Sequence, residues 1–144
     1  MLAPHPFGYD ITPQSLNEKF AAFRQWEDRY RQLILLAKML PALDPALKTA
    51  DIELSGCENR VWLGYEKLPS GGIHFYGDSE GRIVKGLLAV LLTGVEGKTP
   101  QAILTEDPLA LFDDLQLRDQ LSSSRASGLA ALSQAVLNIA HQLS

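Results

Sequence analysis

The sequence is short of cysteine and has no long hydrophobic run. Its 144 residues include one cysteine, Cys57. No disulfide can therefore form within the chain, and the sets of thiolates that hold zinc or iron–sulfur clusters are missing. No stretch approaches the roughly 18 apolar residues of a membrane span, and the start lacks a basic segment followed by an apolar block. We expect a soluble protein in the reducing cytoplasm, with no membrane contact.

Positive charge is also scarce. Thirteen Lys and Arg stand against seventeen Asp and Glu, a net charge of −4. This is the wrong sign for neutralising the phosphates of nucleic acid, so we expect no nucleic-acid partner. Glycine-rich phosphate loops are absent too, because Gly71 and Gly72 belong to a turn and residues 94–97 end a helix. We predict no bound cofactor and no metal ion.

Helices are predicted in the first third of the chain. Residues 26–40 place apolar side chains such as Trp26 and Tyr30 on one stripe at helical spacing, with charged side chains largely elsewhere. Thr12 followed by Pro13 is typical of the N-cap and first position of a helix, which predicts a shorter helix before this one. The N-terminal third is therefore expected to be a helical pair.

From residue 61 the apolar period changes to two. Residues 61–66 and 73–78 alternate between apolar and other side chains, which predicts a β-hairpin. Keeping the apolar sets on one face places Tyr65 opposite Phe75. A third strand around residues 52–54 is a further possibility, because two strands alone are marginally stable.

Helices dominate the rest of the chain. Residues 83–95 are apolar nearly all round and predict a buried central helix. Helix starts are indicated by four sets of capping residues: Asp78 and Ser79, Thr99-Pro100, Asp107-Pro108, and Ser122 to Ser124. We expect one α+β domain over residues 1–144, with a small antiparallel sheet packed against several helices and residues 1–11 flexible.

Cys57 is the candidate nucleophile. It lies in a polar loop, residues 55–59, where packing gives no reason to choose cysteine. Continuing the hairpin ladder brings Cys57 opposite Ile83, in the first turn of the central helix, and a helix N-terminus favours a thiolate. The alternative is an inert buried cysteine, the commoner case for a lone cysteine.

The three histidines offer no obvious base for Cys57. The ladder places His74 opposite Glu66, far along the strand, where we expect it in solvent. His5 lies in the flexible start and His141 lies near the C-terminus. Without a cysteine–histidine pair, a cysteine protease or acyl transferase is disfavoured.

Arginine is the other candidate at this site. Arg125 lies in the first turn of the last predicted helix, where the helix dipole disfavours a cation. It is either a solvated side chain or a group that reaches an anionic sulfur, since arginine stays charged and offers several donors. Arg60 and Arg82 are rivals for that role, and Arg82 is nearer Cys57 in the predicted ladder.

Three segments together resemble the SufE-like sulfur acceptor family: residues 55–65 (SGCENRVWLGY), 74–99 (HFYGDSEGRIVKGLLAVLLTGVEGKT) and 121–132 (LSSSRASGLAAL). Residues 5–8 (HPFG) and 25–41 (QWEDRYRQLILLAKMLP) are most similar to the CsdE branch of that family. Gln116 stands where the family pattern has glycine.

The resemblance implies a small carrier. It would take sulfane sulfur as a persulfide on Cys57 from a pyridoxal-phosphate cysteine desulfurase of the CsdA or SufS type. It would stimulate that enzyme and pass the sulfur to a downstream acceptor, for iron–sulfur cluster assembly or another sulfur-using pathway. It would not be a stand-alone enzyme. The family's arginine near the end of the chain matches Arg125, which the resemblance places near the thiol.

The resemblance also implies a fold shared with IscU-type scaffolds, although one thiol is too few to build a cluster. Transfer of a persulfide needs one reactive thiol and no second cysteine in the same chain. The alternative function is a helical interaction module with an inert cysteine. We further predict that Cys57 is shielded in the free protein and exposed by the desulfurase, with Gly56 as the flexible point.

Overall fold

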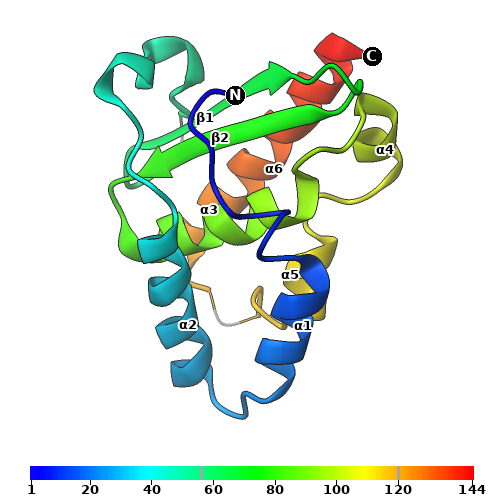
Figure 1. Ribbon diagram of the computed structural model, residues 1–144. Helices are drawn as coiled ribbons and strands as arrows, with labels where there is room; N and C mark the ends of the chain where they lie inside the picture. Colours follow the sequence, from blue (N-terminus) through cyan, green and yellow to red (C-terminus); the bar gives the residue numbers. More distant parts are fainter. Residues whose placement is uncertain (56, 120) are drawn as a thin grey trace.

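The computed structural model describes residues 1–55, 57–119 and 121–144. The elements come in the order helices, hairpin, helices (Figure 1). They are α1 (Pro13–Ala21), α2 (Trp26–Met39), the short 3-10 helices η1 (Pro45–Leu47) and η2 (Ala50–Ile52), β1 (Val61–Lys67), β2 (Ile73–Ser79), α3 (Arg82–Val95), α4 (Pro100–Thr105), α5 (Ala110–Asp114) and α6 (Ser123–Leu143).

Several helices begin where their capping residues predict. The Thr12 hydroxyl accepts a hydrogen bond from the Ser15 N–H, and the Ser15 hydroxyl accepts one from the Thr12 N–H. Thr99 caps α4 through the Ala102 N–H, and Ser122 is the N-cap of α6. The prediction for α3 was wrong, because its N-cap is Gly81, which has no capping side chain.

The residues predicted to cap α3 and α5 have other roles. Neither Asp78 nor Ser79 caps α3. The Asp78 carboxylate instead accepts hydrogen bonds from the Ser79 and Leu43 N–H groups. Asp107 accepts a hydrogen bond from the Leu109 N–H, but α5 itself begins two residues past Pro108, at Ala110. The polar residues before α3 and α5 therefore stabilise turns, and they do not mark the first residue of either helix.

The hairpin has the predicted register, with Tyr65 opposite Phe75 and Glu66 opposite His74. The third strand does not form among the described residues. Residues 50–52 turn as η2, and the chain then makes an isolated bridge between Glu53 and Trp62. The tight turn directly before this bridge leaves too little extended chain for a strand.

Helices cover one face of the hairpin. In Figure 1, α3 lies under the strands, with α6 behind it and α2 below. Gly86 of α3 allows the close approach of α2, since a Cβ there would lie 2.3 Å from the Leu33 carbonyl oxygen. The buried residues of α3 include Leu88 and Leu91, both fully inaccessible, so this helix is the central core element that the sequence predicts.

The other face of the hairpin is buried as well, which the sequence did not predict. Trp62 and Tyr76 pack there with Leu43 in a second apolar cluster. Gly64 makes room for the Tyr76 ring, because a Cβ at Gly64 would lie 2.5 Å from its Cζ. The N-terminal segment crosses beside the strands (Figure 1). Its His5 is buried, and so is Phe7, at 0% exposed, although the sequence led us to expect residues 1–11 to be flexible.

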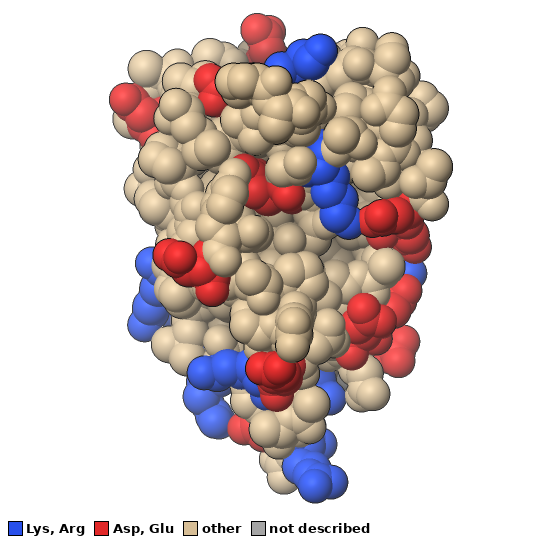
Figure 2. Space-filling model, turned by 45° about the vertical axis from the view of Figure 1, so that its right-hand side comes forward, with Lys and Arg blue, Asp and Glu red and all other residues tan. Residues whose placement is uncertain are grey.

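Charged side chains of both signs are interspersed over the face shown in Figure 2. Among the described residues, several charged side chains form ion pairs, such as Arg118 with Asp113 and Arg60 with Glu53. Across the described parts of the chain, no helix combines the length and apolar character needed to span a membrane.

Candidate functional site around Cys57

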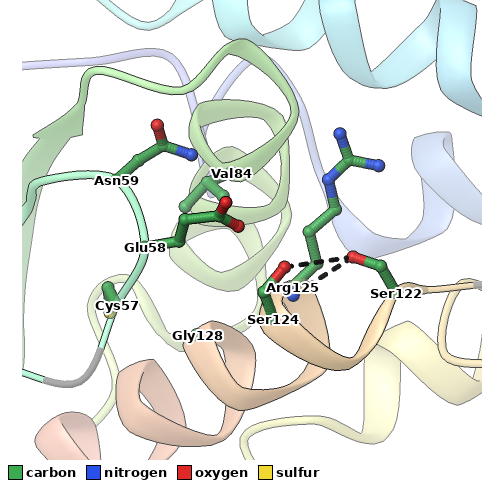
Figure 3. Close-up of a pocket in the computed structure, with 8 residues that line it drawn as sticks. All are labelled: Cys57, Glu58, Asn59, Val84, Ser122, Ser124, Arg125 and Gly128. Atoms are coloured by element: carbon green, nitrogen blue, oxygen red, sulfur yellow. Dashed lines mark hydrogen bonds between the residues drawn. The ribbon is translucent and has the colours of Figure 1, made fainter.

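Cys57 lies half-buried on the loop between η2 and β1, beside a cavity of about 340 Å³. Three segments far apart in the sequence meet at this cavity: the loop itself, the first turn of α3 and the first two turns of α6 (Figure 3). The lining residues are Cys57, Glu58, Asn59, Val84, Ser122, Ser124, Arg125 and Gly128.

The loop is held at both ends. On one side, the Leu54 N–H donates to the Val61 carbonyl at 2.9 Å. On the other, the Arg60 carbonyl accepts from the Ser79 hydroxyl at 3.0 Å and from the Glu80 N–H at 3.1 Å. The loop therefore projects from a fixed base at the start of the hairpin. Gly56, the predicted flexible point, lies outside the described residues.

The hairpin register brings this loop to the N-terminus of α3. The sequence ladder placed Cys57 opposite Ile83, and the structure places the next residue, Val84, beside it in the cavity wall. Val84 is 8% exposed. The apolar side of the cavity therefore comes from the first turn of the central core helix.

The floor of the cavity is one stripe of α6. Ser124 and Gly128 are one turn apart on the helix and Arg125 adjoins them, so the three share a face. Gly128 is buried and lies across from Cys57 (Figure 3). A Cβ built on Gly128 would be 4.0 Å from the Cys57 Sγ. The thiol thus faces bare helix backbone at this point.

Burial raises the pKa of the Cys57 thiol. This differs from the expectation that a helix N-terminus would favour the thiolate. Desolvation disfavours the charged form, and here it is the largest influence on the group. In the free protein Cys57 is therefore a protected thiol, and an attacking thiolate needs further stabilisation.

Arg125 lines the same cavity, but its guanidinium extends away from Cys57 (Figure 3). Its Nη1 donates to the Tyr30 hydroxyl at 2.7 Å, and its Cζ lies 5.5 Å from the centre of the Tyr30 ring. This contact ties α6 to α2. The structure therefore brings Arg125 to the cavity and holds its charge on the neighbouring helix.

The rival arginines lie elsewhere. Arg60 forms two hydrogen bonds with the Glu53 carboxylate and stacks over the Trp62 ring at 4.9 Å. Arg82 is exposed and borders a separate hollow with Lys38 and Lys85. Among these three candidates, Arg125 is the one that lines the Cys57 cavity.

The histidines form a different cluster. His74 was expected in solvent, but it is fully buried: its Nδ1 lies 2.7 Å from a Glu96 oxygen and its Nε2 lies 2.6 Å from the Leu2 carbonyl. The expectation failed because the N-terminal segment covers that face of the strands. His5 joins the same carboxylate at 3.5 Å. His141 lies exposed in the last turn of α6, so within the described chain none of the three approaches Cys57.

This cluster is a hydrogen-bond network rather than a metal site. The His5 Nδ1 accepts from the Phe7 N–H, so the neutral ring carries its proton on Nε2, which donates to the Phe75 carbonyl at 2.7 Å. That nitrogen has no free lone pair for a metal ion. Burial opposes the Glu96 charge, but hydrogen bonds from His5, Tyr9, His74 and the Phe75 N–H outweigh it and lower the pKa of Glu96.

Sequence reasoning missed part of this site. Gly128 carries a readable signal, because a glycine inside the apolar pattern of a long helix destabilises that helix and implies a spatial requirement. Tyr30 carries none, since its helical spacing assigns it equally well to the core stripe. Glu96 comes directly after the predicted helix and gives no sign of its buried partners.

Comparisons with known proteins agree with the motifs. The family model described as SufE, Fe-S metabolism associated domain, matches residues 14–140. The chain is 58% identical over 141 residues to the sulfur acceptor protein CsdE of Escherichia coli (strain K12), covering 98% of this chain and 96% of that protein. It is 37% identical over 120 residues to a SufE-like protein of Rhizobium meliloti (strain 1021), covering 80% and 84%.

The fold also has a solved counterpart. A hypothetical protein from Thermus thermophilus, determined in solution, superposes with a TM-score of 0.70 and 20% sequence identity. The match covers 91% of this chain and 94% of that chain. At this identity the likeness shows the fold, an α+β domain with a small antiparallel sheet, and agrees with the predicted fold class.

Proposed function

Because the chain belongs to the SufE family, we propose that it accepts sulfane sulfur from a cysteine desulfurase as a persulfide on Cys57 and delivers it to a downstream acceptor. The observation that carries the proposal is the setting of Cys57. The single cysteine of the chain lies half-buried on a loop at the edge of the core, with its thiol at a cavity between two helix N-termini.

The transfer itself conserves atoms and needs no external oxidant or reductant. The Cys57 thiolate attacks the outer sulfur of the donor persulfide, the donor S–S bond breaks, and a new S–S bond forms on Cys57. The donor cysteine leaves as a thiolate and takes up a proton. The outer sulfur moves from one chain to the other. One thiol and one persulfide are present both before and after the transfer.

Because the pKa of Cys57 is raised, the desulfurase has to activate this thiol as well as donate sulfur to it. A half-buried thiol with a raised pKa is a poor nucleophile, so the free protein is protected against unwanted reactions. Binding to the desulfurase must expose Cys57 and favour its thiolate. Differential contacts of the desulfurase with an outward loop position are sufficient for this.

Arg125 is the proposed partner of the charged sulfur. Arg125 lines the cavity, and its guanidinium is turned away from Cys57 by one hydrogen bond to the Tyr30 hydroxyl, so breaking that bond would free the side chain to turn its donors toward Cys57. A cation at that position favours the thiolate or persulfide anion over the neutral form. The hydroxyls of Ser122 and Ser124 offer further donors on the same helix turn.

The direction of sulfur beyond this protein is set by its chemistry. One thiol carries one sulfane sulfur and cannot assemble a cluster, so an iron–sulfur scaffold or another sulfur-using protein must receive it. A carrier thiol that has to stay reduced between transfers favours the cytoplasm. The physiological donor is a desulfurase of the CsdA or SufS type.

Replacement of Cys57 by serine tests the proposal. Cys57→Ser should fold normally, because the half-buried loop side chain packs only at the edge of the central core and serine has nearly the same size. It should abolish both sulfur acceptance and stimulation of the desulfurase. Arg82→Ala, a change on the separate surface hollow, serves as the control and should retain both activities. Full stimulation by folded Cys57→Ser would instead favour a binding module with an inert cysteine.

A further inference from the structure

Gly128 occupies an unusual place for a glycine. It is buried in the interior of α6, a helix of 21 residues, and its φ is not in the left-handed region. Glycine in a helix interior is less favourable than alanine by about 1 kcal/mol. The backbone therefore gives no reason for glycine at this position.

Packing in the thiol form gives no reason either. A Cβ built on Gly128 meets one described heavy atom within 4 Å, the Cys57 Sγ at 4.0 Å. That is an ordinary van der Waals distance. Gly86 of α3 differs, because a Cβ there would lie 2.3 Å from the Leu33 carbonyl oxygen. Alanine would thus fit at Gly128 as long as Cys57 carries no extra atom.

The persulfide changes this balance. The S–S bond is about 2.05 Å long, so a sulfur added to Sγ and directed at position 128 would lie only about 2 Å from an alanine Cβ there. With glycine there, the same sulfur meets no Cβ and lies against the backbone of α6 at the edge of the cavity of about 340 Å³ that Gly128 and Cys57 both line. The missing side chain matches the one atom that the reaction adds.

We propose that Gly128 is a positioning residue that makes room for the outer sulfur of the Cys57 persulfide, so that the sulfur lies against α6 and is sheltered from solvent. This inference rests on the proposed function. Val84 closes the apolar side of that space and Arg125 borders its polar side.

Gly128→Ala tests the inference, with Gly94→Ala as the matched control. Gly94 is also helical and is partly buried, and a Cβ there makes ordinary contacts of 3.7 and 3.8 Å with Leu111, away from Cys57. Both variants should melt at or above the wild-type temperature, because alanine favours the helix. Iodoacetamide should alkylate the Cys57 thiol at the same rate in all three proteins.

Loading and loss of the persulfide sulfur should distinguish Gly128→Ala from Gly94→Ala. Each protein is loaded with a desulfurase and cysteine, separated from the enzyme, and challenged with a water-soluble phosphine that removes sulfane sulfur as the phosphine sulfide. Intact mass measures the loss over time. Gly128→Ala should load less fully or lose its sulfur at least fivefold faster than wild type, while Gly94→Ala matches wild type.

Two results would overturn the inference. Wild-type loading together with a wild-type persulfide lifetime in Gly128→Ala would place the outer sulfur elsewhere in the cavity. A lower melting temperature for Gly128→Ala would show that the thiol form already uses the space. If wild type itself gains no sulfur while remaining folded, the proposed function fails, and that outcome is distinct from wild-type loading with an unaffected Gly128→Ala.

Discussion

Replacement of Glu96 by alanine should strongly destabilise the protein. The carboxylate is fully buried and accepts hydrogen bonds from the Phe75 N–H at 2.9 Å, the Tyr9 hydroxyl at 2.5 Å and the His74 Nδ1 at 2.7 Å. Each buried donor that is left without its acceptor costs about 1–3 kcal/mol. We expect Glu96→Ala to lose about 4 kcal/mol, a large share of the 5–15 kcal/mol typical of a domain.

Urea unfolding followed by circular dichroism measures this loss of free energy directly. In a thermal melt, at about 3 °C per kcal/mol, the melting temperature should fall by roughly 12 °C. Glu96→Gln should lose only about 2 kcal/mol. The amide oxygen can still accept from the Phe75 N–H, and neutral hydrogen bonds are about half as strong as charge-assisted ones.

The contribution of Glu96 to the stability of the folded protein should depend on pH. The folded-state pKa of Glu96 lies below its unfolded value, so its contribution is present above about pH 4.3 and is lost as the pH falls through the folded pKa. The stability gap between wild type and Glu96→Ala should therefore narrow on acidification. A loss below 1 kcal/mol at pH 7, or a gap that does not change with pH, would refute this account of the network.

Four further predictions concern the surroundings of Cys57 and one helix end. Since burial raises its pKa, Cys57 in the free protein should be alkylated along a pH curve with its midpoint above about 8.5, and a midpoint near 7 would contradict this. Arg125→Ala should stay folded and slow sulfur transfer about tenfold, the effect of one pKa unit on the thiolate. Tyr30→Phe removes the hydroxyl that holds that arginine and should not slow transfer, so equal defects in both variants would assign the effect to lost packing. Gln116→Gly should raise the free energy of unfolding by about 1 kcal/mol in thermal melts, because Gln116 has a φ of 56°, and no gain would mean that its contact with Arg29 compensates for the strain.

Local rules in the sequence were sufficient for most of the fold. Helix starts at Thr12, Thr99 and Ser122 depend on side chains within three residues, and the hairpin register depends on alternation over a few residues. Burial of His74 depends on the N-terminal segment, about 70 residues earlier in the chain. Periodicity along one strand carries no information on such a cover, so the sequence wrongly placed His74 in solvent.

The sequence likewise predicted one part of the candidate site and missed another. The hairpin ladder brought Cys57 to the first turn of α3, because strand pairing propagates along the chain. It could not foresee that α6 supplies the cavity floor, since nothing local to Cys57 specifies its packing partner. The raised pKa of the thiol depends on that same packing. Charge reasoning from a helix N-terminus alone therefore gave the wrong direction.

The most direct test of the account is the intact mass of the protein after incubation with a cysteine desulfurase, pyridoxal phosphate and cysteine. The account predicts a gain of one sulfur atom per chain, located on the peptide that contains Cys57, reversed by a thiol reductant and absent from Cys57→Ser. A folded wild-type protein that forms a complex with the desulfurase yet gains no reducible sulfur would contradict the central claim.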